Sequence, residues 1–175
     1  MKILAFAGSN STKSINHQFI KYIANNIYDH DLEIIRLTDY DIPLYSVDIE
    51  NKGFPKEMIR LHSIIREADA IIISVAEHNG NITAFFKSII DWVSRYDREF
   101  LKDKKWLLIS TAPGKRGGAS ALAIAKKMLD YFKGELVGTY SLSNFYTSLV
   151  GDEIVDKEIK TEIDKLVQSF EDSLI

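Results

Sequence analysis

Small hydroxyl-bearing residues follow the first apolar run of this chain, in the order Gly8-Ser9-Asn10-Ser11-Thr12-Lys13-Ser14-Ile15-Asn16. The run lies between residues 3–7, which predict a short buried strand, and a pattern typical of a helix. Such a junction gathers backbone N–H groups, hydroxyls and the positive end of a helix dipole, which together bind phosphate. The sequence therefore predicts a phosphate site here, with an ordinary turn capped by Ser14 as the alternative.

This loop differs from the common nucleotide-binding loops. It has neither the Gly-x-Gly-x-x-Gly fingerprint for dinucleotides nor the Gly-Lys-Ser/Thr of nucleoside-triphosphate P-loops. Hydroxyls in place of glycines favour a phosphomonoester that is hydrogen-bonded from several sides over a pyrophosphate.

Two further loops carry residues suited to a flat heteroaromatic ring. Residues 76–81 read Ala-Glu-His-Asn-Gly-Asn, in which the backbone can present N–H and C=O groups to the ring edge and His78 can cover the ring. Residues 113–118 read Pro-Gly-Lys-Arg-Gly-Gly, in which glycines allow close approach and Lys115 and Arg116 could attract a nicotinamide dinucleotide phosphate. The alternatives are a plain Asn-Gly turn and a solvated pair of cations.

Apolar runs alternate with helical patterns along the whole chain. The expected strands span residues 2–7, 32–37, 70–76, 105–111 and 136–142, and the expected helices span residues 15–28, 55–67, 83–95, 118–132 and 154–174. Strict alternation predicts one α/β domain over residues 1–175, with a five-stranded parallel sheet of order 2-1-3-4-5 and helices on both faces. Ligands of such three-layer sandwiches sit beyond the carboxyl ends of the strands, so we expect the three loops to share one site.

Composition excludes several classes of function. The chain has 175 residues and a net charge of −3, without the basic excess that nucleic acid would require. It has no cysteine, which excludes disulfides and thiolate chemistry, and its four scattered histidines do not have metal-ligand spacing, so we expect no metal site. No apolar run is long enough for a bilayer and no signal-peptide layout is present, so we expect a cytoplasmic protein that does not contact a membrane.

In these motifs the chain resembles the NAD(P)H-dependent FMN reductases of the flavodoxin-like superfamily, which include quinone, chromate and azo-dye reductases. The family's Gly-Ser-x-Arg-x-x-Ser-x-Asn corresponds to residues 8–16 and its Pro-Glu-Tyr-Asn to residues 76–79. Its Leu-Lys-Asn-x-Ile-Asp-Trp-x-Ser-Arg corresponds to residues 86–95, and its glycine-rich turn to residues 114–119. The Asp-Ile-Pro-Leu-Tyr segment at residues 41–45 is also similar, and the resemblance covers residues 1–150.

The resemblance implies which residues contact FMN. The phosphate would be surrounded by Ser9, Ser11, Thr12, Ser14 and Asn16. The isoalloxazine would be faced, mainly by backbone atoms, by Glu77, His78, Asn79 and Gly80, and its other edge would be lined by Thr111, Gly114 and Gly117. The chemistry would belong to the cofactor, so no side chain is predicted to be catalytic. A structural or interface role is expected for Asp91, Trp92 and Arg95.

Two departures from the family pattern fall in these sites. The arginine of the phosphate loop is Ser11 here, which removes a charge-assisted contact to the phosphate, and Lys13 could substitute for it. The family's proline and tyrosine are Ala76 and His78. The histidine changes the polarity over the ring and could donate a proton to a reduced quinone.

The resemblance implies an oxidoreductase that works by a ping-pong mechanism. Hydride would pass from NAD(P)H to FMN and then to a small-molecule acceptor such as a quinone, an azo compound or free flavin. The resemblance also implies a homodimer or homotetramer. Two alternatives stay open: a flavodoxin-type one-electron carrier, which the small net charge of −3 disfavours, and a non-enzymatic binding module that has lost flavin.

Overall fold

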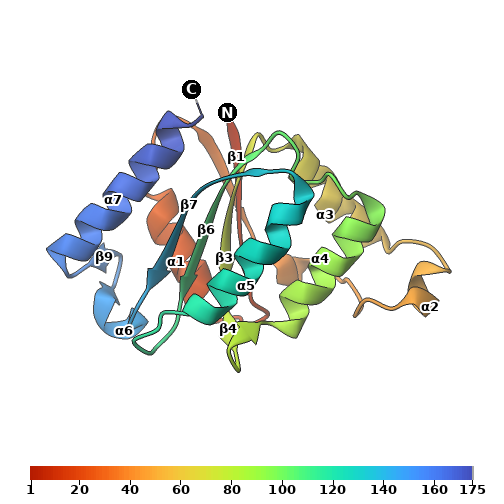
Figure 1. The fold of residues 1–175 in the computed structure, drawn as a ribbon, viewed down its shortest axis with the longest axis horizontal. Helices are drawn as coiled ribbons and strands as arrows, with labels where there is room; N and C mark the ends of the chain where they lie inside the picture. Colours follow the sequence, from red (N-terminus) through yellow and green to blue (C-terminus); the bar gives the residue numbers. More distant parts are fainter. Residues whose placement is uncertain (175) are drawn as a thin grey trace.

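Five parallel strands form the central sheet in the order β2-β1-β3-β6-β7 (Figure 1). They span Lys2–Gly8 (β1), Asp31–Ile35 (β2), Ala70–Val75 (β3), Lys105–Thr111 (β6) and Glu135–Leu142 (β7). The structure is a computed structural model and describes residues 1–174. Counted among themselves in chain order, these strands are arranged 2-1-3-4-5, so the predicted topology is confirmed.

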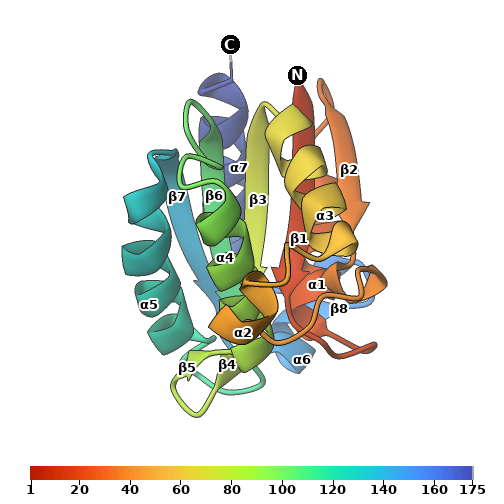
Figure 2. The same cartoon turned by 90° about the vertical axis from the view of Figure 1, so that its right-hand side faces the viewer.

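The sheet is buried on both faces because consecutive side chains of a strand point to opposite sides. Leu4 and Phe6 pack in one core with side chains of three helices, whereas Ile3 and Ala5 pack in a second core with side chains of two others. Figures 1 and 2 show α3, α4 and α5 on one face and α1 and α7 on the other. These helices span Ile15–Ala24 (α1), Lys56–Glu67 (α3), Ala84–Tyr96 (α4), Ala119–Leu129 (α5) and Lys157–Asp172 (α7). The two cores explain why the strands read as nearly continuous apolar runs.

The last helix begins later than the sequence predicts. Its expected start, Ile154, instead pairs with Leu149 in a small antiparallel hairpin. Asp156 then caps α7, because its carboxylate accepts hydrogen bonds from backbone N–H groups of the first turn. The helices that were expected to reach residues 28 and 132 also end early, at the boundaries given above.

Several short elements were not predicted. They are too brief to carry a periodic pattern, and tertiary contacts hold them in place. Along residues 1–174 they are α2 (Val47–Glu50), β4 (Glu77–His78), β5 (Asn81–Ile82), α6 (Phe145–Ser148), β8 (Leu149–Val150), β9 (Glu153–Ile154) and two 3-10 turns at Leu37–Asp39 and Asp130–Phe132. None of the helices in this part of the chain is long and apolar enough to cross a membrane.

Side chains of α4 fasten the long segment that precedes α3. The indole N–H of Trp92 donates to the carbonyl oxygen of Pro43 (2.8 Å), and the ring of Tyr45 packs edge-on against the same indole (5.0 Å between centroids). The guanidinium of Arg95 donates to the carboxylate of Glu50 through both Nε (3.1 Å) and Nη2 (2.9 Å). Trp92 and Arg95 therefore have the structural role that the resemblance implied.

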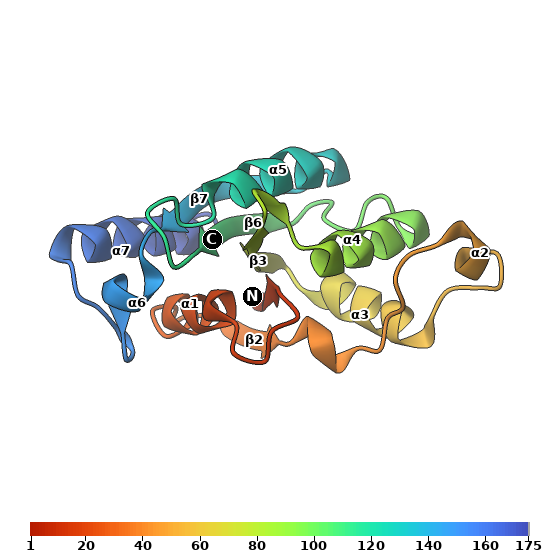
Figure 3. The same ribbon diagram turned by 90° about the horizontal axis from the view of Figure 1, so that it is seen from below.

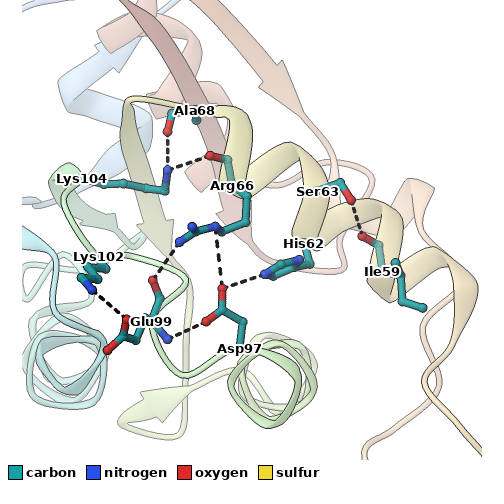
Figure 4. A network of polar contacts seen from close by, with 9 residues as sticks. All are labelled: Ile59, His62, Ser63, Arg66, Ala68, Asp97, Glu99, Lys102 and Lys104. Atoms are coloured by element: carbon teal, nitrogen blue, oxygen red, sulfur yellow. Dashed lines mark hydrogen bonds and ion pairs between the residues drawn. The ribbon is translucent and has the colours of Figure 1, made fainter.

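A polar network closes the opposite edge of the sheet, where β3 and β6 begin (Figure 4). The buried ammonium of Lys104 donates to the carbonyl oxygens of Arg66 and Ala68 at the end of α3. Beyond α4, the carboxylate of Asp97 contacts Nε2 of His62 (2.9 Å). These contacts fix the ends of α3 and α4 at the amino edge of the sheet. The carboxyl ends of the strands take no part in them.

The carboxylate of Asp97 is expected to make folding sensitive to acid. Burial by itself raises the pKa of Asp97, but the hydrogen bond from His62, the backbone N–H of Glu99 and the nearby Arg66 outweigh it and hold that pKa below its usual value. The stabilisation is therefore complete above about pH 4, the pKa of an unfolded aspartate, and is lost as the pH falls through the lower folded value.

We predict that Asp97→Asn lowers the free energy of unfolding by about 1 kcal/mol at pH 7, since a partly buried charged contact is lost. In urea titrations the deficit should shrink as the pH falls from about 4 through the lowered folded pKa of Asp97, because the wild-type carboxylate protonates there. Asp164→Asn, in an exposed pair with Lys160, is the control and should change little at any pH. A deficit for Asp97→Asn that is the same at both ends of this range would contradict the assignment.

Candidate functional site

The three predicted loops meet at the carboxyl edge of the sheet, which Figure 3 views from below. A cavity of about 240 Å³ lies between them, and we call it the edge cavity. It is lined by Ser9, Ser11, Lys13, Ser14, Ile15, Asn16, Ala76, Glu77, His78, Thr111, Ala112, Pro113 and Tyr146. Segments that are far apart in the sequence therefore share one site, as the topology predicts.

Each serine hydroxyl of the first loop accepts a backbone hydrogen bond, which leaves its O–H group as a potential donor to a ligand. Ser9 Oγ accepts from the N–H of Ser11 (3.3 Å), Ser11 Oγ accepts from the N–H of Lys13 (3.2 Å), and Ser14 Oγ accepts from the N–H of His17 (3.2 Å). Each oxygen thus accepts a hydrogen bond that stabilises the turns of the loop, and each O–H remains available to donate to a ligand. The loop therefore offers hydroxyl donors beside the first turn of α1, whose leading N–H groups have no partner inside the helix.

Ser14 is the N-cap of α1, so the turn that was the alternative reading is present too. The two readings do not exclude each other, because capping uses only a lone pair of the hydroxyl. Buried His17 follows in the first turn, and its pKa is lowered by burial first and by Arg36 and Lys21 next. A neutral imidazole there leaves the loop without an extra positive charge at neutral pH.

The side chain of Asn16 joins the first loop to two strands. It is 2% exposed, and its Oδ1 accepts from Ser74 Oγ (2.8 Å) and from the backbone N–H of Thr111 (3.0 Å). Its Nδ2 donates to the carbonyl oxygen of Thr111 (3.1 Å). The amide therefore ties the start of α1 to β3 and to the end of β6, and it sets the spacing of the loops around the edge cavity.

The end of β1 is held against α4 in a similar way. Thr83 Oγ1 donates to the carbonyl oxygen of Gly8 (2.9 Å) and accepts from the N–H of Phe86 (3.0 Å). A Cβ on Gly8 would lie 2.6 Å from the ring of Phe86, so the close approach of α4 requires glycine here. The first glycine of the phosphate loop is thus explained by packing.

The second loop is a tight hairpin of β4 and β5. Asn79 and Gly80 both have positive φ (52° and 74°), which is the geometry of a two-residue type I′ turn. His78 and Asn81 are a cross-strand pair, and their neighbours Glu77 and Ile82 form the next pair. The Asn-Gly turn that was the alternative for this loop is present, and His78 lines the edge cavity beside it.

The carboxylate of Glu77 is bound by the start of α5 and by Arg116. Its Oε2 accepts from the N–H groups of Ser120 (3.0 Å) and Ala121 (3.1 Å), and its Oε1 contacts the guanidinium of Arg116 (3.3 Å). These contacts compensate the negative charge with a helix N-terminus and a cation. Although Glu77 is in the lining, its compensated charge therefore repels an anionic ligand in the edge cavity less than an unpaired carboxylate would.

The third loop is anchored to the end of β7. Thr111 Oγ1 donates to the carbonyl oxygen of Leu142 (2.8 Å). Gly117 has a φ of 56°, and a Cβ there would lie 2.6 Å from Ser141 Oγ, so glycine is required here by the close contact with β7. A Cβ on Gly114 would meet nothing within 4 Å, so space remains beside that residue.

Most of the predicted cofactor-binding residues line the edge cavity, and five do not. Those outside the lining are Thr12, Asn79, Gly80, Gly114 and Gly117. Sequence reasoning overlooked Tyr146, an exposed side chain of α6 that closes one side of the cavity. It follows the fifth strand of the sheet, whose loop we did not assign to the site.

A larger groove of about 1200 Å³ adjoins the edge cavity between α4 and α5, and His78 lines both. We call it the α4/α5 groove. Its apolar walls are formed by Ile82, Ile124, Met128, Tyr131 and Phe132, and its cations are Lys87, Arg95, Arg98 and Lys127. The site therefore consists of a small polar cavity that opens towards a large, mainly apolar groove.

Comparison with known proteins gives a consistent picture. A model of the NADPH-dependent FMN reductase family matches residues 1–147. An NAD(P)H-dependent FMN reductase of Pseudomonas aeruginosa is 29% identical over 121 residues, which are 69% of this chain and 65% of the relative. A quinone reductase of Escherichia coli is 38% identical over 80 residues, 45% of this chain and 43% of the relative.

Among solved structures, FerB of Paracoccus denitrificans, a flavoenzyme NAD(P)H:(acceptor) oxidoreductase, superposes with a TM-score of 0.79 at 25% identity. The match covers 99% of this chain and 96% of FerB. The similarity thus extends over the whole sandwich and includes all three loops of the site.

We predict that Asn16→Ala lowers the free energy of unfolding by about 2–3 kcal/mol, because buried partners in β3 and β6 lose their hydrogen bonds. Asn26→Ala is a matched control, since that amide makes one bond to the carbonyl oxygen of Tyr22 near the surface. It should cost less than about 1 kcal/mol. Equal losses for both variants in urea unfolding would show that Asn16 is not a special junction.

Proposed function

This chain belongs to the NADPH-dependent FMN reductase family, and from that premise we propose how its residues hold FMN and what the protein reduces. It is an oxidoreductase that uses FMN as cofactor and NAD(P)H as co-substrate. FMN, when bound, would supply two-electron hydride chemistry between the nicotinamide and an acceptor. The protein supplies binding, orientation and charge.

The donor set of the edge cavity fits the phosphate of FMN. Hydroxyls of Ser9, Ser11 and Ser14 are free to donate, and the N-terminus of α1 adds its partial positive charge. We propose that the phosphate rests on this loop and that Thr12, which is exposed, contacts it from outside. Asn16 acts as a positioning residue, because its amide is already engaged with Ser74 and Thr111.

The ring system would extend from this loop towards His78. We propose that the hairpin at residues 77–80 faces the isoalloxazine with backbone groups, and that Thr111, Gly114 and Gly117 border its other edge. The open space beside Gly114 and the exposed position of His78 support this arrangement. The hydroxyl of Thr111 already donates to Leu142 in β7, and its N–H donates to Asn16. Thr111 would therefore touch the ring by van der Waals contact and not by donating a hydrogen bond.

We propose that the acceptor is a small molecule such as a quinone, an azo compound or free flavin, reduced in a second step at the same site. The similarity to a quinone reductase supports this class. Use of NAD(P)H supports a cytoplasmic location, as we expected from the sequence.

The test of this function is an absorbance spectrum of the purified protein with added FMN, followed by anaerobic NADH or NADPH. We predict a bound flavin whose visible band bleaches with at least one nucleotide and returns when a quinone is added. A bound flavin that stays oxidised would indicate a one-electron carrier. A protein that binds no flavin would indicate a module that has lost its cofactor.

We further propose that the protein is a homo-oligomer that associates through the α4/α5 groove. Exposed Ile124 (37%) on α5 and exposed Tyr131 (74%) in the 3-10 turn that follows it both line the groove, and burying such apolar surface favours association. The groove shares His78 with the edge cavity, so an interface here would place a partner next to the flavin.

We predict that the wild type sediments as a dimer or tetramer and that Tyr131→Glu shifts it to monomer, because a charge would be buried at the contact. Tyr28→Glu is the matched control, since Tyr28 is equally exposed (78%) on a different face and should leave the assembly intact. Analytical ultracentrifugation distinguishes these outcomes. A monomeric wild type, or an assembly that survives Tyr131→Glu, would contradict the proposed interface.

A further inference from the structure

The phosphate loop of this chain lacks the cation that its family pattern contains, because Ser11 stands where the family has arginine. The phosphate of FMN carries close to two negative charges at neutral pH. Hydroxyls and a helix N-terminus can solvate these charges but bring no full positive charge of their own. A counter-charge must therefore come from elsewhere for FMN to be preferred over uncharged riboflavin.

Lys13 is the one lysine or arginine among the residues that line the edge cavity within residues 1–174. The other candidates near the loop are outside the lining, engaged or neutral, and Lys115 is not among the lining residues. Arg116 pairs with the carboxylate of Glu77, and the pKa of His17 is lowered by burial. The ammonium of Lys13 makes no ion pair with a carboxylate in the same part of the chain, so its charge is available to a ligand.

The backbone of Lys13 is fixed in a useful place. Its N–H donates to Ser11 Oγ (3.2 Å), and the next residue, Ser14, caps α1. The lysine thus stands between two hydroxyls of the donor set and directly before the helix N-terminus. Its side chain is exposed, so its charge remains solvated and is screened by salt.

We propose that Lys13 is the counter-charge of the FMN phosphate in this chain and decides its preference for FMN over riboflavin. This rests on the proposed function, and it concerns how that site selects its cofactor. An exposed ammonium is a more weakly fixed partner than the bidentate guanidinium it replaces. The affinity for FMN should therefore fall with ionic strength, and the cofactor should exchange with the free pool.

The test is equilibrium titration of the protein with FMN and with riboflavin, followed by quenching of flavin fluorescence at low and high salt. Lys13→Gln should weaken FMN binding about tenfold at low salt, which is the scale of one exposed charge-assisted contact. Riboflavin binding should not change, and the salt dependence for FMN should flatten. Lys21→Gln, on α1 and outside the cavity lining, is the matched control and should behave as the wild type.

Restoring the family pattern gives a second readout that does not depend on loss of function. Ser11→Arg in the Lys13→Gln background should recover FMN affinity, because a cation returns to the loop at the family position. FMN affinity of Lys13→Gln within twofold of the wild type would overturn the proposal. So would an equal loss for FMN and riboflavin, since that indicates a general disturbance of the loop. A wild type that binds neither flavin would instead overturn the proposed function itself.

Discussion

The carboxamide of Asn16 is the interaction on which the site depends. One side chain accepts from a hydroxyl of β3 and from the backbone of β6, and it donates back to β6. An amide can both accept and donate in this way, whereas an ionised carboxylate has no donor. The bond set is buried, so leaving it incomplete costs the desolvation of several polar groups. The spacing of the loops at the carboxyl edge of the sheet follows from it.

The charged and polar groups around the edge cavity favour binding of an anion. Glu77 is in the lining, but its carboxylate is taken up by the start of α5 and by Arg116. The first loop then presents hydroxyls, a helix N-terminus and the ammonium of Lys13. Under the proposed function, these groups would let a chain with a net charge of −3 hold a phosphate ester without a large basic surface. The electron transfer itself belongs to the cofactor, so no side chain needs a strongly shifted pKa for it.

The sequence predicted the sheet order and the meeting of the loops because both follow from strand alternation and from the geometry of parallel sheets. It did not predict how residues 41–55 are anchored, because the anchoring contacts come from Trp92, Arg95 and other side chains of α4, which lie far along the chain. It gave a different reason for Gly117, which serves the contact with β7. It also missed Tyr146, because α6 is too short to produce a pattern. Local periodicity is visible in a sequence, whereas such contacts arise only after folding.

The central claim is that the phosphate of FMN lies on the hydroxyl loop at the start of α1. A crystal structure of the protein with FMN tests it most directly. The account predicts phosphate oxygens within about 3.2 Å of the hydroxyls of Ser9, Ser11 and Ser14 and of the leading N–H groups of α1, with the ring extending towards His78. A phosphate bound elsewhere, for example among the cations of the α4/α5 groove, would contradict it.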